Sequence, residues 1–62
     1  MVHLVVLETV DSEKATFVIE NITTIYSCDN ETRIWNCAGK YCDVKESIEE
    51  ITKRINQIVY DK

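Results

Sequence analysis

Short apolar runs broken by polar turns occupy the chain up to residue 44, and a longer amphipathic segment follows them. The short runs are rich in β-branched and aromatic residues, which is typical of β-strands. They predict five strands, at about residues 2–8, 15–20, 22–28, 32–37 and 40–44. The last segment predicts a helix at about residues 47–60. We therefore expect a single α+β domain over residues 1–62, with an antiparallel β-sheet or meander of four to five strands packed by one C-terminal α-helix.

The first predicted strand, residues 2–8, carries apolar side chains on both of its faces. Strands of this kind are buried on both sides, whereas a strand with one wet face alternates between apolar and polar residues. The sequence therefore predicts either a central strand or a strand whose second face meets a partner subunit.

The fourth and fifth predicted strands flank Ala38 and Gly39, where glycine adopts a positive φ at little cost. They predict a tight hairpin, whose register decides which side chains share a face. A three-residue loop places Ile34 on the same side as Cys42 and Val44. A loop of two or four residues instead places a different set together, namely Trp35, Cys37, Cys42 and Val44. The pattern leaves both registers open.

The predicted helix begins near residue 46 with a capping box, because Glu50 follows Ser47 by three positions. Two acid–base pairs at a spacing of four, Glu49 with Lys53 and Glu50 with Arg54, are expected on its solvent face. The apolar residues recur at helical spacing and predict one stripe that lies on the sheet. This stripe consists of Ile48, Ile51, Ile55, Ile58 and Val59.

Length and charge narrow the range of partners. A chain of 62 residues buries only about 60% of the surface that it exposes when unfolded, so we expect a homo-oligomer. The net charge is −4, from eleven acidic and seven basic residues with no basic stripe, so nucleic acid is not an expected partner. The N-terminal apolar run lacks a basic start, and no run approaches the roughly 20 residues that span a bilayer. We therefore expect no membrane association and a cytoplasmic location.

Residues that carry metal or nucleophilic chemistry are few. Three cysteines, an odd number, predict reduced thiols that pack as small buried hydrophobic residues. Cys28, Cys37, Cys42 and His3 offer the atoms of a Cys₃His zinc site, but they lack the closely spaced cysteine pair of such sites, so we expect no metal and no cofactor. The single imidazole, His3, lies in an apolar strand far along the chain from the thiols. No nucleophile–base pair is predicted, and the chain is not expected to be an enzyme.

Two groups of residues are candidates for binding. Either hairpin register exposes at least one of Trp35 and Tyr41, and exposed aromatic residues on a sheet face serve as interaction anchors. Tyr26 is instead expected in the core. The second candidate surface is acidic and comprises Glu46, Glu49 and Glu50 on the helix, with Asp61 beyond it.

The lack of a catalytic set and the two apolar faces of the first strand favour a non-enzymatic protein-binding or regulatory module that acts as a homo-oligomer. One alternative is a phage or mobile-element inhibitor of a host enzyme or defence complex, whose acidic surface imitates nucleic-acid phosphates. Another is a protein that sequesters a small ligand at a subunit interface. Small phage-encoded proteins are similar to this chain in size, acidity and organisation.

A Gly-Lys turn, a Tyr/Val strand and a Val-Lys-Glu-Ser junction into a helix follow one another in the second half of the chain. In these features the chain resembles the FlbD type of small bacterial flagellar and swarming-motility proteins. The resemblance implies a β-meander followed by a short helix, and a role in motility. The chain differs from the family pattern at Asn36, Ala38 and Asp43. The matching residues are Ile22, Ile25, Ile34, Gly39, Lys40, Val44, Lys45, Glu46, Ser47, Glu49, Glu50 and Ile51.

Overall fold

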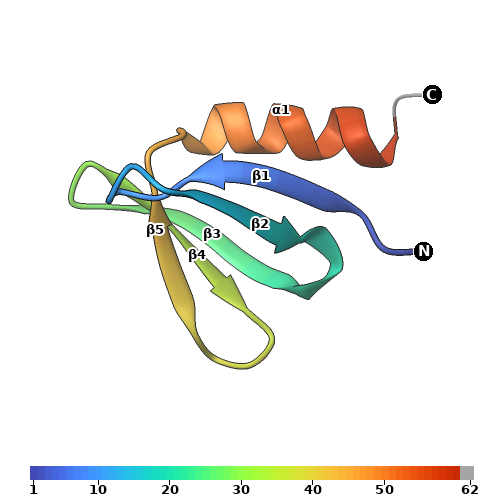
Figure 1. The fold of residues 1–62 in the computed structure, drawn as a ribbon, viewed down its shortest axis with the longest axis horizontal. Coiled ribbons are helices and arrows are strands. Elements are labelled where there is room, and N and C mark those ends of the chain that lie inside the picture. The colour runs from blue at the N-terminus through green and yellow to red at the C-terminus, as the bar shows by residue number, and fades with distance from the viewer. Residues whose placement is uncertain (61–62) are drawn as a thin grey trace.

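Five antiparallel strands precede one C-terminal helix in the structure, a computed structural model that describes residues 1–60 (Figure 1). The predicted α+β class is confirmed, with strands that differ from the predicted ranges by a few residues at their ends. A short 3₁₀ helix, η1, replaces the end of the second predicted strand. The elements are β1 (Leu4–Glu8), β2 (Lys14–Val18), η1 (Ile19–Asn21), β3 (Ile22–Cys28), β4 (Glu31–Asn36), β5 (Tyr41–Val44) and α1 (Ile48–Val59).

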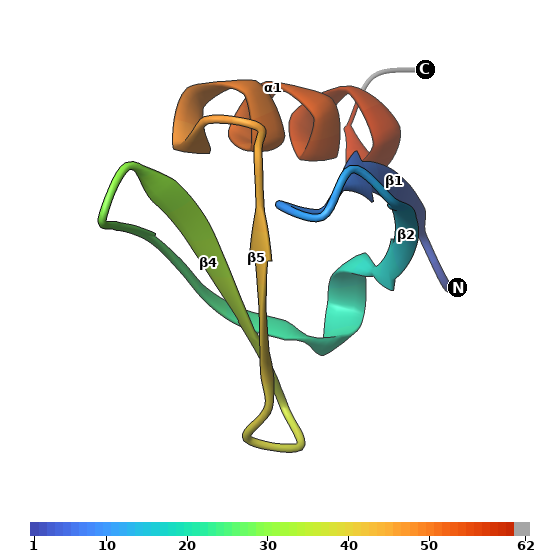
Figure 2. The same ribbon diagram turned by 60° about the vertical axis from the view of Figure 1, so that its left-hand side comes forward.

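The strands form two sheets, a β1–β2 hairpin and a β3–β4–β5 meander (Figure 2). The end of β1 and the end of β5 meet at a single antiparallel bridge between Thr9 and Val44. Two backbone hydrogen bonds flank this bridge, from Lys45 N–H to the Glu8 carbonyl at 2.9 Å and from Val10 N–H to the Asp43 carbonyl at 3.1 Å. The two sheets therefore touch at one corner and diverge from it.

β1 is not a central strand, because its only ladder partner in residues 1–60 is β2. The side chains of Val5 and Leu7 are buried in the core, while those of Leu4 and Val6 on the opposite face are about half exposed. The first of the two alternatives for this strand is thus wrong. Whether its second face meets a partner subunit stays a prediction.

The β4–β5 hairpin adopts the three-residue register, with Ile34 opposite Cys42 and Asn36 N–H bonded to the Lys40 carbonyl at 2.9 Å. Gly39 takes a φ of +79°, a conformation that an L side chain disfavours. This register keeps Ile34 and Val44 on the buried face, where both are almost fully enclosed. The loop length is therefore selected by what the inner face packs against.

The helix α1 begins at the N-cap Ser47, whose hydroxyl accepts a hydrogen bond from the Glu50 backbone N–H at 3.1 Å. The reciprocal half of the predicted capping box is absent from the bonds found in residues 1–60, because the Glu50 carboxylate binds Arg54 instead. Lys53 forms no ion pair with Glu49 in the same part of the chain, whereas the predicted pair of Glu50 and Arg54 is confirmed. No helix within residues 1–60 is long and apolar enough to cross a membrane.

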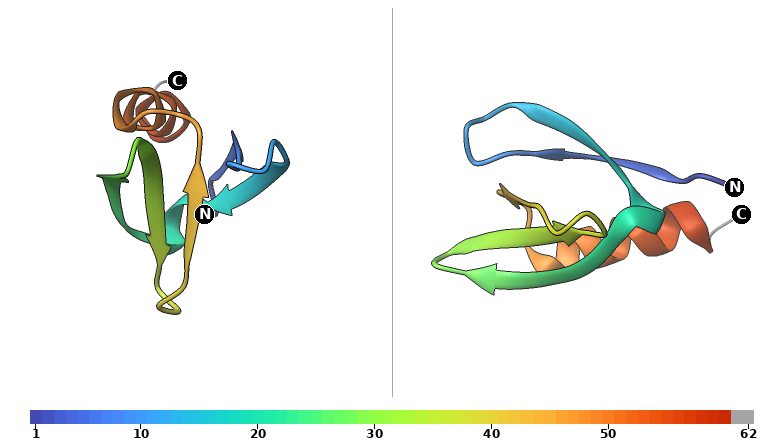
Figure 3. Two further views of the ribbon diagram at one scale, coloured as in Figure 1. Left: turned by 90° about the vertical axis from the view of Figure 1, so that its left-hand side faces the viewer. Right: turned by 90° about the horizontal axis from the view of Figure 1, so that it is seen from below.

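The core lies between the two sheets and α1, which contacts both β1 and β3 (Figure 3). Ile51 is the fully buried residue of the helix, and Ile55 packs partly buried beside it. The predicted apolar stripe is thus buried at its centre and open near its C-terminal end, where Ile58 is 38% exposed. The fully buried apolar residues are Val5, Leu7, Ile34, Val44 and Ile51.

Candidate binding surface

The strand period of two places a group of aromatic and charged side chains on the face of β3–β4–β5 that points away from the core. Because Ile34 and Cys42 point inward, their neighbours in sequence point outward. The pairing register sets Trp35 beside Tyr41, Arg33 beside Asp43, and Tyr26 beside Arg33. We call these residues the outer sheet face: Tyr26, Arg33, Trp35, Tyr41 and Asp43.

The two aromatic residues predicted as binding anchors are in contact. The ring centroids of Trp35 and Tyr41 lie 5.0 Å apart with an interplanar angle of 54°, a tilted arrangement that aromatic pairs favour. Tyr41 is 53% exposed, and Trp35 is half-buried beside it. Tyr26 is 37% exposed on the same face, so its predicted core position is wrong. The register of β3 against β4, rather than the apolar character of the ring, decides this.

Arg33 forms a bidentate ion pair with Asp43 and lies over the ring of Tyr41. Its Nε donates to Asp43 Oδ1 at 2.8 Å, and its Nη2 donates to Oδ2 at 3.1 Å. The guanidinium carbon is 4.0 Å from the centroid of the Tyr41 ring. The hydrogen bond raises the pKa of Arg33 and lowers the pKa of the Asp43 carboxyl. Both charges are therefore fixed and mutually compensated within the outer sheet face.

Arg33 and Asp43 belong to this surface, although neither is among the residues predicted to bind. Both lie two positions from a predicted anchor, Arg33 before Trp35 and Asp43 after Tyr41. A spacing of two in a strand places side chains on one face, so this spacing was the available signal. Only the register, which the sequence leaves open, brings Arg33 and Asp43 side by side.

The acidic candidate residues are mostly engaged in holding the fold. Glu46, with a side chain only 14% exposed, accepts one bifurcated hydrogen bond from the Glu8 backbone N–H, at 3.1 Å to Oε1 and 3.0 Å to Oε2. Its carboxylate is 3.6 Å from Arg54. Glu50 binds Arg54 at 2.8 Å, and this hydrogen bond lowers the pKa of its carboxyl. Glu49 is exposed and has no ion-pair partner within residues 1–60. The three acids therefore do not form a free acidic patch.

Asp61, the fourth acid of the predicted acidic surface, lies outside the described residues. The remaining charge on that side of α1 comes from Glu49 and from Lys53, which have opposite signs. Within residues 1–60, the helix thus offers little net negative charge to a basic partner.

The residues of the considered zinc site are dispersed. His3 binds the Glu20 carboxylate at the start of β1, while Cys28 ends β3. Cys37 is exposed in the β4–β5 loop, contrary to the prediction of three buried thiols. Cys42 points inward, and burial raises the pKa of its thiol. In residues 1–60, no three His, Cys, Asp or Glu side chains lie close enough together to hold a metal ion.

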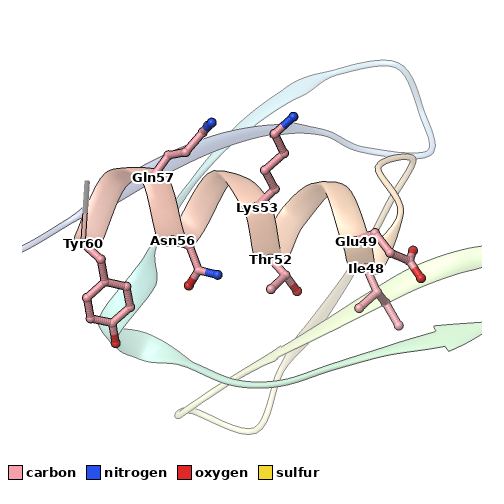
Figure 4. A pocket seen from close by; sticks show the side chains of 7 residues that line it. All are labelled: Ile48, Glu49, Thr52, Lys53, Asn56, Gln57 and Tyr60. Atoms are coloured by element: carbon pink, nitrogen blue, oxygen red, sulfur yellow. The ribbon is translucent and has the colours of Figure 1, made fainter. Parts of the chain in front are cut away.

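A hollow on the surface of α1 is lined by residues of this helix and by its C-cap, Tyr60 (Figure 4). Lys53 and Gln57 project from one side of the helix, and Ile48, Thr52 and Asn56 from the other. All buried side-chain polar atoms in residues 1–60 have hydrogen-bond partners. Within that range, the hollow therefore contains no buried polar group that lacks a partner and could bind a ligand. The hollow brings together no groups from different elements, and it is a weaker candidate than the outer sheet face. Its full lining is Ile48, Glu49, Thr52, Lys53, Asn56, Gln57 and Tyr60.

The contact between His3 and Glu20 predicts an acid-sensitive step in stability. Hydrogen bonds from His3 lower the pKa of Glu20 from its ordinary 4.5 to about 2. A carboxyl with a depressed folded-state pKa stabilises the fold above pH 4.5, and this contribution is lost as the pH falls from about 4.5 to about 2. We expect Glu20→Gln to flatten this part of the curve of melting temperature against pH. The exposed Glu49→Gln serves as the control, and equal slopes for the two variants would contradict the prediction.

The chain matches no family model, no curated protein and no solved structure. The resemblance to FlbD-type proteins therefore stays a prediction. A functional assignment rests on the geometry of the described residues, among which the outer sheet face is the best-organised surface.

Proposed function

We propose that this chain is a non-enzymatic protein-binding module that acts as a homo-oligomer, and that the outer sheet face binds its protein partner. The observation that carries this proposal is the contact of Trp35, Tyr41 and Arg33 on one exposed sheet face. Trp, Tyr and Arg are the residues most enriched at the energetic centres of protein interfaces. Here all three lie within one small area of the surface.

The arrangement lowers the entropic cost of binding. Immobilising a free side chain at an interface costs about 0.5–1.5 kcal/mol. Trp35 and Tyr41 already contact each other, and Arg33 is already held by Asp43. A partner that covers this surface gains the buried aromatic area without first ordering these side chains.

The compensated charges of the face predict weak salt dependence. Because Arg33 and Asp43 neutralise each other, a contact centred on the aromatic pair responds little to ionic strength. The alternative function, inhibition of a basic host site by phosphate-like acids, requires free carboxylates and a steep salt dependence. It draws less support, since Glu46 and Glu50 have partners within the fold.

The non-enzymatic part of the proposal is supported by the placement of the nucleophiles. His3 is held by Glu20 at the start of β1, while the inward-facing Cys42 has a raised thiol pKa that disfavours the thiolate. The proposal includes a cytoplasmic location, in which free thiols at Cys28 and Cys37 persist.

The proposal predicts that Tyr41→Ala reduces capture of the partner by at least about tenfold, the loss that corresponds to about 1.4 kcal/mol at an interface centre. Tagged wild-type and variant chains are used as bait in a lysate of cells that naturally produce this chain. The proteins that each bait retains are then compared. Bound proteins are quantified at two salt concentrations. Trp35, the single tryptophan, reports the same contact directly, because a covering partner shifts its emission and shields it from a soluble quencher.

Tyr60→Ala is the matched control for this experiment. Tyr60 is 75% exposed at the end of α1 and lies outside the outer sheet face, so its removal should leave capture unchanged. Circular dichroism checks that both variants keep the fold. Equal capture by the two tyrosine variants would place the binding surface elsewhere. Capture that disappears at high salt in the wild type would favour the acidic inhibitor instead.

A further inference from the structure

The β1–β2 hairpin carries a second apolar surface, which the core does not use. The pairing register places Leu4 beside Val18 and Val6 beside Thr16, all on the side facing away from the core. Val2 lies two positions before Leu4, a spacing that in extended chain places side chains on one side. Exposure is 66% for Val2, 53% for Leu4 and 48% for Val6. We call these five residues the hairpin outer face: Val2, Leu4, Val6, Thr16 and Val18.

The C-terminal end of α1 extends this surface. The helix runs antiparallel to β1 (Figure 1), with Arg54 Nη1 donating to the Val6 carbonyl at 3.1 Å. Four further helix residues rise about 6 Å, and two strand residues span about 6.6 Å. Ile58 is therefore level with Leu4, and its side chain is 38% exposed. An apolar strip thus continues from the hairpin to the last turn of the helix.

Apolar side chains left in water on one face of a hairpin do not contribute the free energy that their burial would provide. The inner face, with Val5 and Leu7, already packs in the core. β1 is not covered by a further strand along its length, because β5 meets it only at the Thr9–Val44 bridge. Within residues 1–60 nothing covers the outer face of β1, so of the two sequence-based alternatives the contact with a partner subunit remains.

We propose that the hairpin outer face packs against the same face of a second copy of this chain across a two-fold axis. The inference rests on the homo-oligomer in the proposed function and assigns the surface that forms it. A two-fold contact joins identical patches, so each patch must be self-complementary. An uncharged apolar face meets this condition, whereas two acidic faces on chains of net charge −4 would repel.

None of the five residues of the hairpin outer face is charged, which supports the choice of a second copy. Charged side chains lie at its two ends, where Glu8 lies beside Lys14 and pairs with Lys45 and where Glu20 pairs with His3. Arg54 lies at its edge, bound to the Val6 carbonyl. Additional apolar burial would stabilise the fold, because the core of one copy contains only five buried apolar residues within residues 1–60. A second copy of the chain is available wherever the protein is produced.

The exposed apolar area provides the centre of such a contact. The exposed fractions of Val2, Leu4, Val6 and Ile58 together equal about two whole apolar residues. A standard interface buries about 800 Å² on each partner. The apolar residues therefore supply the centre of the interface, and the exposed Thr16 and the residues around the face supply its rim.

The test measures the mass of the full chain in solution by sedimentation velocity and native mass spectrometry at about 1–100 μM. The wild type is expected at twice the monomer mass of 7.2 kDa, with a melting temperature that rises with concentration. Leu4→Lys is expected to weaken the dimer at least 30-fold and to remove the concentration dependence. An equimolar mixture of Leu4→Lys and Leu4→Glu is expected to restore a dimer, because the two-fold axis brings the opposite charges together. Thr52→Lys adds the same charge on the exposed side of α1 and should leave the dimer intact.

A wild type that is monomeric throughout this range overturns the inference together with the homo-oligomer of the proposed function. A wild-type dimer that Leu4→Lys leaves unchanged overturns the inference alone. If Leu4→Lys does not fold, Val2→Lys, which precedes β1 and is more exposed, takes its place. Loss of partner capture by Tyr41→Ala is read independently, so failure at one surface does not count against the other.

Discussion

Ile51→Ala is expected to unfold most of the protein at 25 °C. Ile51 is completely buried where α1 meets the two sheets, and it is the fully buried residue of the helix. Truncating a buried isoleucine to alanine costs about 2–5 kcal/mol, through lost burial and the cavity that remains. A core of this size rarely supplies more than about 3–5 kcal/mol in total. Urea denaturation followed by circular dichroism should show loss of most of the helix signal even without denaturant.

Ile51→Val is the graded control for this prediction. It removes one methylene group and is expected to cost about 0.5–1.5 kcal/mol, which leaves a cooperative transition at a lower urea concentration. An Ile51→Ala variant as stable as Ile51→Val would show that α1 does not depend on this contact. The core assigned between the helix and the sheets would then be wrong.

Glu46→Ala is expected to destabilise the fold by about 1–3 kcal/mol, the cost of leaving a part-buried donor without its partner. The Glu46 carboxylate accepts a bifurcated hydrogen bond from the backbone N–H of Glu8 and lies 3.6 Å from Arg54. In this way it closes the edge of β1 that β2 does not pair. The midpoint of urea unfolding measures the effect.

Glu49→Ala provides the matched control. Glu49 lies three positions after Glu46, in the first turn of α1, but its side chain is exposed. Its replacement should change the free energy of unfolding by less than about 0.5 kcal/mol. Equal effects for the two glutamates would mean that Glu46 is only one more surface acid. In that case Glu46 would again be a candidate for the acidic binding surface.

The helix was predictable because its signals are local. The capping residue Ser47, the recurrence of Ile51 and Ile55, and the pair of Glu50 with Arg54 all lie within a few positions of one another. The predicted range of residues 47–60 and the observed Ile48–Val59 accordingly differ by one residue at each end. The turn at Asp29 and Asn30 is predictable from local sequence in the same way, because Asp and Asn tolerate the positive φ that both residues adopt.

The candidate surface was predictable only in part. Trp35 and Tyr41 were recognised as residues that a hairpin would expose, but their contact required the three-residue register. Two registers satisfied the sequence pattern, because each gathered apolar side chains on one face. The choice was made by the packing of Ile34 and Val44 in the core, which no short window of sequence contains.

By itself, the sequence determined the class of the fold, the approximate position of every strand, and the helix with its cap, since these depend on propensity, periodicity and turn chemistry over a few residues. The tertiary structure decided which strands pair, which face of each hairpin is buried, and whether a charged residue binds or supports the fold. Glu46 shows the physical reason. Its role is set by the Glu8 backbone N–H, which lies 38 positions away in the chain and beside it in space.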